Sequence, residues 1–447
     1  MCGLTALIYR MSTAPVRTRY LAVTALAVLA LAGCAVDTEG YVTDSGGPIT
    51  VWVDPPRVPA VEAFRKAFPD IPVEVTTING NVGSTELQQK FVLFNQAGQG
   101  WPDAIFFPSN DDIAWAAGSK INYVRDIGQN LGDIIPEYPS SVIAQCRIDG
   151  RVRCLRNDAA PDVLWYDAEL FRQWGYRPPV TWEDYERLSL DIVREHPGYL
   201  TGFLGDAYAP DRYLWASGCP TNERLSEKQV RIDLGDDRCT RIRGLLARLT
   251  AAGALSPSGI FSPDAATLGR RLVMSPGAVW WGNFLFRDTW KVDPGRITAA
   301  APLRWRADET PSTSSEGGGL WGFSRHITGV QLQNALTFAR FVATDPRWQV
   351  ELSVGLPAYG PLQQPWLDRQ RQGRYLADFD SAAVAFVRAA EIVRGGRDYT
   401  RYNTGSVWTH TITPALAAGQ PFGPAWDTFG TRLTSEARSF GYAVSAA

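Results

Sequence analysis

The chain has 447 residues, enough for two or three domains with sizeable cores. Its 44 Lys and Arg residues nearly balance 46 Asp and Glu residues. The first 33 residues hold three Arg and no acid, which leaves a net charge of −5 on the rest. This balance argues against nucleic acid as a partner, and it provides no polybasic patch for an anionic membrane surface.

The N-terminal segment has the pattern of a secretory signal. Three Arg residues precede a twelve-residue apolar run from Tyr20 to Leu31, too short to span a bilayer, and the run ends in Leu-Ala-Gly-Cys34. This tetrapeptide resembles a bacterial lipobox, whose Cys is lipidated and becomes the mature N-terminus. We therefore predict a lipoprotein signal peptide at 1–33, lipidation at Cys34, and a tether at 34–47. The protein would be anchored by lipid on the extracytoplasmic face of the cell membrane. An ordinary signal peptide with an incidental Cys is the alternative.

Strand-like and helix-like segments alternate after the tether. β-branched and apolar runs predict strands at 49–53, 73–78 and 104–107, and apolar residues at helical spacing predict helices at 59–68 and around 87–94. Strand, helix, strand, helix, strand is the order of an α/β lobe with a largely parallel sheet.

The alternation recurs along the rest of the chain. Thr181-Trp182-Glu183-Asp184 is typical of a capping box that opens a helix, and Asp345-Pro346 stops a strongly apolar helix at 330–342. Further strands are predicted at 163–166, 277–281 and 297–301, and further helices at 381–394 and in a stretch that leads to Leu416.

Four cysteines remain after Cys2 and Cys34 are set aside. An even number outside the cell indicates two disulfides. Of the three possible connectivities, we favour the local one, Cys146–Cys154 and Cys219–Cys239, because Asp149-Gly150 predicts a hairpin turn between the first two cysteines. A zinc site is the alternative, but the sequence has no CxxC and no nearby His to support it.

Taken together, the segments resemble those of the extracellular solute-binding proteins of ABC sugar importers, family 1, which includes maltose-, trehalose- and glycerophosphodiester-binding types. The resemblance covers about residues 48 to 440. Four stretches carry it: 49–68, Trp101-Pro102-Asp103-Ala104-Ile105-Phe106-Phe107, Val163 to Phe171 continuing into Pro178-Pro179-Val180-Thr181-Trp182-Glu183, and 334–355. The third stretch is the most specific.

The resemblance implies an α/β fold of the periplasmic-binding-protein-like type II. In that fold two α/β lobes are joined by a multi-crossover hinge and close over a ligand. Carried over to this sequence, the first lobe comprises 48–159 and 303–358, and the second comprises 160–302 and 359–447. The chain would cross between the lobes near 158–161, 301–304 and 356–361, and the cleft would lie at strand carboxyl ends.

Candidate ligand-binding residues of the first lobe follow strand ends. Asp54 ends the opening strand, and the resemblance implies a sugar-binding polar residue shortly after strand 104–107, where the alternative is a helix N-cap. Glu316 to Trp321 is similar to the family's glycine-rich strand, whose backbone approaches the ligand. The first-lobe candidates are Asp54, Asn110, Asp111, Gly318, Gly319 and Trp321.

Candidates of the second lobe combine polar groups with rings, because a sugar offers hydroxyls and an apolar C–H face. The resemblance implies a stacking ring near Trp281-Gly282-Asn283-Phe284 and a last cleft segment at Arg401-Tyr402, with a further ring at Trp408. Strand capping for Asp162 and helix packing for Trp408 are the alternatives. The second-lobe candidates are Asp162, Trp281, Asn283, Phe284, Arg401, Tyr402 and Trp408.

The function implied is capture of a carbohydrate, either a di- or oligosaccharide or a glycerophosphodiester, and its delivery to ABC permease subunits. We expect a monomer with no cofactor, no metal and no catalytic residue. The three His residues are scattered, and the HExxH, GxSxG and Walker motifs are absent from the sequence. A secreted glycoside hydrolase, which needs only two carboxylates, and a surface lipoprotein that binds no ligand are the alternatives.

Overall fold

The computed structural model describes residues 46–80, 82–308, 310–394 and 399–445. The predicted signal peptide, Cys34 and nearly all of the predicted tether lie outside these residues. None of the described helices has both the length and the apolar character that crossing a membrane requires.

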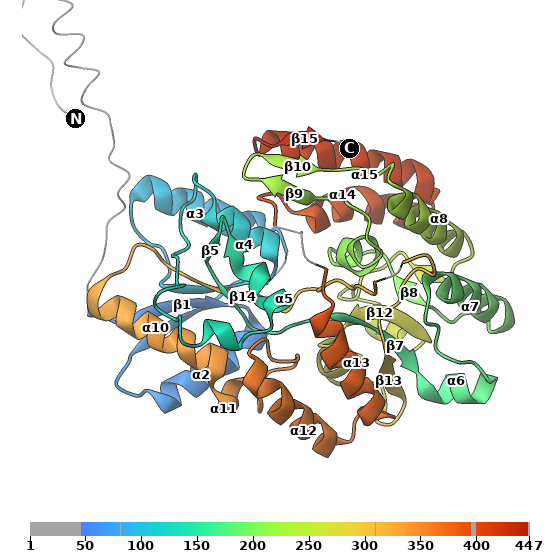
Figure 1. Ribbon diagram of the computed structural model, residues 1–447, viewed down its shortest axis with the longest axis horizontal. Helices are drawn as coiled ribbons and strands as arrows, with labels where there is room; N and C mark the ends of the chain where they lie inside the picture. Colours follow the sequence, from blue (N-terminus) through green and yellow to red (C-terminus); the bar gives the residue numbers. More distant parts are fainter. Residues whose placement is uncertain (1–45, 81, 309, 395–398, 446–447) are drawn as a thin grey trace, which may run out of the picture. The chain divides into compact units, whose positions relative to one another are not determined.

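A five-stranded sheet forms the core of the first lobe, in the order β2-β1-β3-β14-β6. Two of its strands, β1 and β14, are labelled in Figure 1. β1 is parallel to β2 and β3, and β14 is antiparallel to β3 and β6. Alternate residues of β1 are fully buried because its β-branched side chains pack on one face of the sheet. The strands are β1 (Ile49–Val53), β2 (Val73–Thr77), β3 (Ala104–Phe107), β6 (Leu155–Arg156) and β14 (Leu320–Phe323).

A second sheet, β12-β7-β13, is antiparallel throughout and forms the core of the second lobe. Smaller pairings complete the strands: β8 with β11, β10 with β9 and β15, and β4 with β5. Their bounds are β4 (Arg147–Ile148), β5 (Arg151–Val152), β7 (Asp162–Asp167), β8 (Gly202–Phe203), β9 (Glu223–Ser226), β10 (Gln229–Arg231), β11 (Leu255–Ser256), β12 (Met274–Ala278), β13 (Ile297–Ala300) and β15 (Ala443–Ser445).

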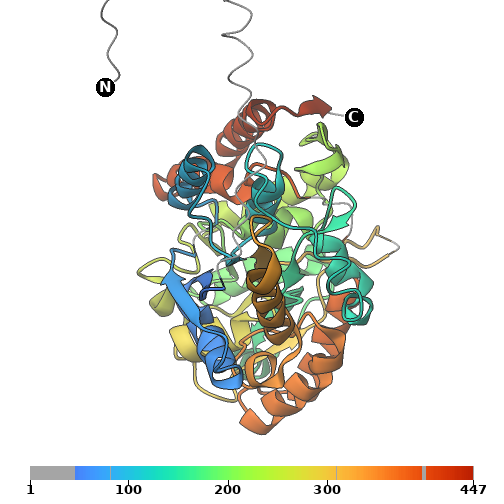
Figure 2. The same ribbon diagram turned by 90° about the vertical axis from the view of Figure 1, so that its left-hand side faces the viewer.

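Helices cover both sheets. α2 and α10 pack on the first sheet, and α10 lies in the foreground of this lobe in Figure 2, whereas α13 packs on β7 and β13. The bounds are α2 (Val58–Ala67), α3 (Thr85–Ala97), α4 (Asn110–Ala117), α5 (Ser140–Ile143), α6 (Ala168–Trp174), α7 (Trp182–Glu195), α8 (Asp237–Ala251), α9 (Ala265–Gly269), α10 (Gly329–Thr344), α11 (Pro346–Gln349), α12 (Gln363–Gly373), α13 (Phe379–Glu391), α14 (Thr404–Ala417) and α15 (Phe422–Ser439).

Local signals correctly predicted β1, β2 and β3 and the strands of the second sheet, as well as several helices, but gave no prediction for elements such as α8 and α12. The predicted capping box begins α7, where the Thr181 hydroxyl accepts a hydrogen bond from the Asp184 backbone N–H at 3.1 Å. The strand predicted at 277–281 is wrong at its end, because β12 stops at Ala278 and the chain turns into a π-helix at Gly282–Thr289. The turn brings the Trp281 ring over Gly277, where a Cβ atom would lie 2.7 Å from a ring carbon.

Both predicted disulfides are confirmed, Cys146–Cys154 and Cys219–Cys239. The first closes the β4–β5 hairpin at Asp149-Gly150, and both turn residues have positive φ, +53° and +74°. A disulfide across a short loop stabilises the fold mainly by restricting the unfolded chain.

Extended segments join the two sheets. Residues 157–161 connect β6 to β7, and isolated backbone pairs link Asp158 to Pro357 and Pro161 to Ser315. The crossing predicted near 301–304 comes later, because Arg304 still pairs with Thr181 beside α7 and the chain reaches β14 through residues 313–319. The residue bounds given above for the two lobes stay a prediction.

Candidate functional site

A cavity of about 210 Å³ lies between the carboxyl ends of β1, β2 and β3 and the second lobe. Its lining comes from three sources: strand ends of the first lobe, loops of the second lobe, and the crossover segments. In that order they are Asp54, Pro55, Pro56, Arg57, Gly80, Phe106 and Pro108; Tyr208, Phe261, Trp280 and Phe284; and Asp158, Gly317, Gly318, Gly319 and Val354.

The first-lobe wall, called the charged wall below, contains the pair Asp54 and Arg57 together with Gly80, Phe106 and three prolines. Asp54 follows β1, and its carboxylate accepts a hydrogen bond from Arg57 Nη1 at 3.2 Å, with both side chains largely buried. The Arg57 guanidinium also lies 4.2 Å from the centre of the Phe106 ring. Burial raises the pKa of Asp54, and the nearby Arg57 opposes this shift. Gly80 leaves room for the carboxylate, since a Cβ atom there would lie 2.8 Å from Asp54 Cβ.

The second-lobe wall is aromatic. Tyr208, Phe261, Trp280 and Phe284 form one cluster, in which the Phe261 and Trp280 rings are parallel with centroids 6.2 Å apart. Tyr208 and Phe284 each meet both of these rings edge-on at 6.0–6.3 Å. Phe261 is 54% exposed, whereas Trp280 is only 7% exposed and donates its indole N–H to the Glu316 backbone oxygen at 2.8 Å.

Three successive glycines form the crossover side of the cavity. The backbone φ angles of Gly317, Gly318 and Gly319 are all positive, between +60° and +79°, a range that residues with side chains rarely adopt. The space is also closed to larger residues, because a Cβ atom on Gly319 would lie 1.9 Å from the Phe106 ring and one on Gly318 would lie 2.6 Å from Ala160 Cβ. The glycine backbone therefore reaches the cavity without intervening side chains.

A narrower cavity of about 20 Å³ shares Tyr208 and Gly317 with the first one. The predicted residues Asn110 and Asp111 line it, on α4. Ser109 is the N-cap of this helix, not Asn110. The Asp111 carboxylate accepts the backbone N–H of Thr400 at 3.1 Å, and Asn403 Nδ2 donates to the Ser109 hydroxyl at 3.3 Å. These bonds join α4 to the segment before α14.

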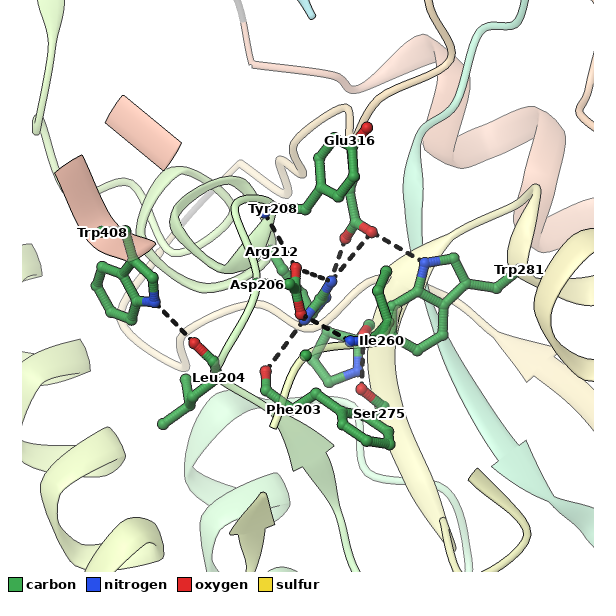
Figure 3. A network of polar contacts seen from close by, with 12 residues as sticks. Phe203, Leu204, Asp206, Tyr208, Arg212, Ile260, Ser275, Trp281, Glu316 and Trp408 are labelled. Carbon is green, nitrogen blue, oxygen red and sulfur yellow. Dashed lines mark hydrogen bonds and ion pairs between the residues drawn. The ribbon is translucent and has the colours of Figure 1, made fainter. Parts of the chain in front are cut away.

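Behind the aromatic wall lies a buried arginine with two carboxylate partners (Figure 3). Arg212 is fully buried in a π-helical turn, and it donates to Asp206 and to Glu316 at 2.9–3.2 Å. Trp281 Nε1 adds a hydrogen bond to Glu316 Oε1 at 2.9 Å. Burial and the nearby Asp162 raise the pKa of Glu316, against the opposing effect of Arg212.

Of the predicted site residues, Asp54, Phe284, Gly318 and Gly319 line the larger cavity, and Asn110 and Asp111 line the smaller one. Tyr402 lies instead in a separate polar groove beside α14 and α15. Arg401 packs near Tyr442, with its guanidinium 6.0 Å from that ring.

The remaining predicted residues are in the protein interior and outside both cavities. Trp281, Trp321 and Trp408 are fully buried. Trp321 donates to Asn157 Oδ1 at 3.1 Å, and Trp408 donates to the Leu204 backbone oxygen at 2.7 Å. Their indole N–H groups are thus satisfied by the core, as buried Trp requires.

Two predicted polar residues, Asp162 and Asn283, are buried and form hydrogen bonds within the protein interior. Asp162 is 2% exposed and accepts the Ser314 hydroxyl, and burial raises its pKa to about 6. Asn283 donates to the Val354 backbone oxygen at 3.0 Å and accepts from Arg287. Both residues connect the second lobe to crossover segments rather than facing the cavity.

Most residues that line the larger cavity were not among the predicted site residues, and the missed ones include Arg57, Asp158, Tyr208, Phe261 and Trp280. One signal could have found Phe261, since it lies in Ser256-Pro257-Ser258-Gly259-Ile260-Phe261-Ser262-Pro263, where turn residues surround a large ring. Trp280 could not be separated from Trp281 without knowing where β12 ends.

The two walls differ in what they can bind. Carboxylate, guanidinium and backbone groups on one side can exchange hydrogen bonds with hydroxyls, and the four rings on the other can cover an apolar face. Among the described residues there is no group of three or more His, Cys, Asp or Glu side chains that could hold a metal ion.

Comparison with known proteins gives a family match over part of the chain and a fold match over most of it. Residues 54–221 match the family model described as bacterial extracellular solute-binding protein. No curated protein matches the chain in sequence. Among solved structures, the ABC transporter associated binding protein from B. animalis subsp. lactis Bl-04, in complex with beta-1,6-galactobiose, is 20% identical. It has a TM-score of 0.72 over 89% of this chain and 99% of that one.

Two further structures agree with this fold. The galacto-N-biose-/lacto-N-biose I-binding protein from Bifidobacterium longum, in complex with lacto-N-biose, has a TM-score of 0.70 at 15% identity, over 90% of this chain and 100% of that one. Maltose-bound MalE3 from T. maritima has a TM-score of 0.62 at 14% identity, over 87% and 99%. The chain thus has the fold of ABC sugar-binding proteins and, over residues 54–221, the family match of a bacterial extracellular solute-binding protein, as the resemblance predicted.

Proposed function

We propose that this protein is an extracytoplasmic binding protein that captures a neutral di- or oligosaccharide between its lobes and delivers it to the permease of an ABC transporter. The observation that carries this proposal is the cavity with one charged wall and one aromatic wall, each from a different lobe. A sugar has hydroxyls around its edge and C–H groups on its face, so it needs both kinds of wall at once.

The solved relatives support carbohydrate as the class of ligand. Structures of the same fold hold beta-1,6-galactobiose, lacto-N-biose and maltose. These are all neutral disaccharides. The family match and these neighbours concern binding proteins, which favours binding without turnover over glycoside hydrolysis.

The charges at the cavity favour a neutral ligand over a glycerophosphodiester. The phosphate of such a ligand would need an available cation. Arg57, which lines the cavity, is already paired with Asp54, and Asp158 adds a second acid to the lining. Arg401, a further cation among the predicted site residues, lies beside Tyr442 and outside both cavities.

Ligand capture would favour the closed form because the sugar contacts both lobes. The hydrogen bonds of Asp111 with Thr400 and of Ser109 with Asn403 join α4 to the segment before α14, and in this proposal they would help to hold the closed form. The closed protein would then dock on the permease as a monomer.

A thermal-shift and calorimetry screen tests the proposal. The panel contains beta-1,6-galactobiose, lacto-N-biose, maltose, longer oligosaccharides and glycerophosphocholine. A ligand at a hundred times its Kd adds about 2.7 kcal/mol to the free energy of unfolding, a readily visible shift. The expected result is a saturable shift with a neutral sugar that is recovered intact. A response to glycerophosphocholine alone would contradict the neutral class, and release of cleaved sugar would contradict binding without turnover.

We further propose that Cys34 is lipidated and holds the protein at the membrane. Support comes from the lipobox-like Leu31-Ala32-Gly33-Cys34. Replacing Cys34 with Ser should move the protein from the membrane fraction to the soluble fraction and remove the mass of the acyl chains. A variant that stays in the membrane fraction would contradict this anchor.

A further inference from the structure

The aromatic wall depends on one buried cation behind it. Arg212 donates through all three guanidinium nitrogens: Nε and Nη2 reach Glu316, Nη1 and Nη2 reach Asp206, and Nη1 reaches the Phe203 backbone oxygen, all at 2.9–3.2 Å. Its guanidinium carbon lies 4.7 Å from the centre of the Trp281 ring. Two carboxylates therefore hold one fully buried arginine, an arrangement in which the loss of a single partner is costly.

The Asp206 side of this group fixes two of the cavity rings. Its Oδ1 accepts the backbone N–H of Tyr208 at 3.0 Å, and its Oδ2 accepts that of Ile260, the neighbour of Phe261, at 3.4 Å. Gly205 also donates to the Ser258 backbone oxygen at 3.1 Å. The loop with Tyr208 and the loop with Phe261 are thus held to the same carboxylate, which Arg212 orients (Figure 3).

The Glu316 side fixes the third ring to the crossover. The Glu316 backbone oxygen accepts the indole N–H of Trp280, and its carboxylate accepts that of Trp281. The Glu316 backbone N–H in turn donates to the Ala160 oxygen of the first crossover at 3.1 Å. Glu316 directly precedes the glycines that line the cavity, so this segment is tied both to the rings and to the hinge region.

We propose that Arg212 is a positioning residue that fixes Tyr208, Phe261 and Trp280 relative to the crossover segment 315–317. The three rings and the crossover segment are thereby held together and would move together. The role of this arrangement in binding rests on the proposed function, in which a sugar that contacts the rings would change the position of the crossover segment through Arg212. The placement itself is a property of the unliganded protein and can be measured without any sugar.

Arg156 offers a matched control, because it is a second buried arginine that donates hydrogen bonds to the crossover segment 315–317. It is 1% exposed and approaches from the first lobe, where Nη2 donates to the Ser315 hydroxyl at 3.1 Å and to the Gly317 oxygen at 2.7 Å. Its other hydrogen bonds go to Asn110, Gln145 and the Asp158 oxygen. Arg156 and Arg212 thus share the crossover but differ in whether they reach the ring loops.

Amide hydrogen exchange of the unliganded full-length protein separates the two roles. In Arg212→Lys, which keeps the charge but loses the guanidinium fork, we expect about tenfold or faster exchange in peptides with Tyr208 and Ile260 and in 313–319. In Arg156→Lys, we expect faster exchange in 313–319 and near Asp158, but unchanged exchange at Tyr208 and Ile260. The indole N–H signal of Trp281, assigned with Trp281→Phe, should shift in the first variant and stay in the second.

Unchanged protection at Tyr208 and Ile260 in folded Arg212→Lys would overturn the proposal, as would equal loosening of these loops in Arg156→Lys. If Arg212→Lys does not fold, Glu316→Gln replaces it, because it weakens the bonds to Arg212 without removing the acceptor of the Tyr208 or Ile260 N–H. That variant should loosen Tyr208 and Ile260, and unchanged exchange there would again overturn the proposal. The exchange experiment uses no sugar, so its result does not depend on the outcome of the sugar screen. Failure of the proposed function is therefore distinguishable from failure of this inference.

Discussion

The two walls of the cavity are built in different ways. The first-lobe wall uses the end of a parallel strand and the turn that follows it, so Asp54 and Gly80 are placed by β1 and β2 themselves. The second-lobe wall uses loops and a π-helical turn, and its rings are placed by the buried group around Arg212. The charged wall is therefore a product of sheet topology, whereas the aromatic wall is a product of tertiary contacts.

The difference has an energetic side as well. Burying rings stabilises the folded chain, so part of the aromatic wall also serves as core. Burial of the Asp54 carboxylate costs free energy, and its ion pair with Arg57 offsets this cost only in part, because the pKa of Asp54 stays raised. Variants of each wall should therefore differ in whether stability, affinity or pH dependence changes.

The largest expected effect is on the aromatic wall. Trp280→Ala should lower the free energy of unfolding by about 3–5 kcal/mol, because the ring is almost fully buried and its removal leaves a cavity. Urea denaturation followed by circular dichroism measures this loss. Phe261→Ala is the matched control, and its cost should be well below that of Trp280→Ala because the ring is half exposed. Equal losses would show that the two rings do not differ in structural role.

The next effect is a pH dependence of stability that comes from a buried carboxyl group in the first lobe. Burial raises the pKa of Asp112 on α4 to about 7, and the nearby Asp111 contributes in the same direction. Between about pH 4 and pH 7 the folded state then holds a proton that the unfolded state releases. The free energy of unfolding therefore falls as pH rises through this window, by on the order of 2–4 kcal/mol. Asp112→Asn should remove this part of the decline when urea unfolding is compared at pH 4.5 and pH 8.

Asp236 provides a control of opposite sign. Arg238 lowers its pKa to about 2, so its contribution is present above pH 4 and is lost only as pH falls toward 2. Asp236→Asn should leave the decline between pH 4.5 and pH 8 in place. If Asp112→Asn declined as steeply as the wild type, the buried acid would not be the source.

Phe261→Ala should affect binding more than folding. Loss of an exposed ring that covers a sugar face should weaken binding by about 1–3 kcal/mol, the worth of a buried aromatic contact. Calorimetry with the sugar found in the screen measures the change. Unchanged affinity would remove Phe261 from the binding wall and leave Trp280 and Phe284 as its ring surface.

Asp54→Asn should have a smaller effect. One oxygen of Asp54 is paired with Arg57, and Oδ1 is buried with no hydrogen-bond partner among the described residues. A sugar hydroxyl donating to this carboxylate would lose about 1 kcal/mol when the acceptor becomes a neutral amide. Asp103→Asn is the control, since Asp103 is equally buried in the same lobe but bonds to Thr50 and Gln331 away from the cavity. Equal affinity losses in both variants would indicate an indirect effect on the lobe.

Local signals predicted the α/β character and several elements, whereas the two-lobe architecture followed from the family resemblance. Alternating β-branched residues marked β1, a capping box marked α7, and Asp149-Gly150 marked the hairpin inside the first disulfide. The charged wall followed in part, since Asp54 directly succeeds a strand whose end could be read from the sequence. Arg57 was missed because its role comes from an ion pair and a ring contact, neither of which has a sequence signature.

The aromatic wall could not be predicted in the same way. Trp280 and Trp281 are adjacent, and which of them reaches the cavity depends on β12 ending at Ala278. Tyr208 and Phe261 come from loops some 50 residues apart, which meet through Asp206, a Gly205–Ser258 backbone hydrogen bond and the contact between the two rings. Rings are also common in cores, so a Trp in a matching segment is weak evidence for a site.

Trp408 is the test of that last point, and its substitution should have the smallest effect on binding. The ring is fully buried against Phe422 and Phe429, and its indole N–H donates to the Leu204 backbone oxygen (Figure 3). Trp408→Phe should lower the free energy of unfolding by about 1–3 kcal/mol, because the Leu204 oxygen loses its buried partner. The affinity for the sugar should change by less than about 0.5 kcal/mol, as for sites that share no partners. An affinity loss as large as that of Phe261→Ala would extend the aromatic wall into the core and remove the distinction between rings that bind and rings that support.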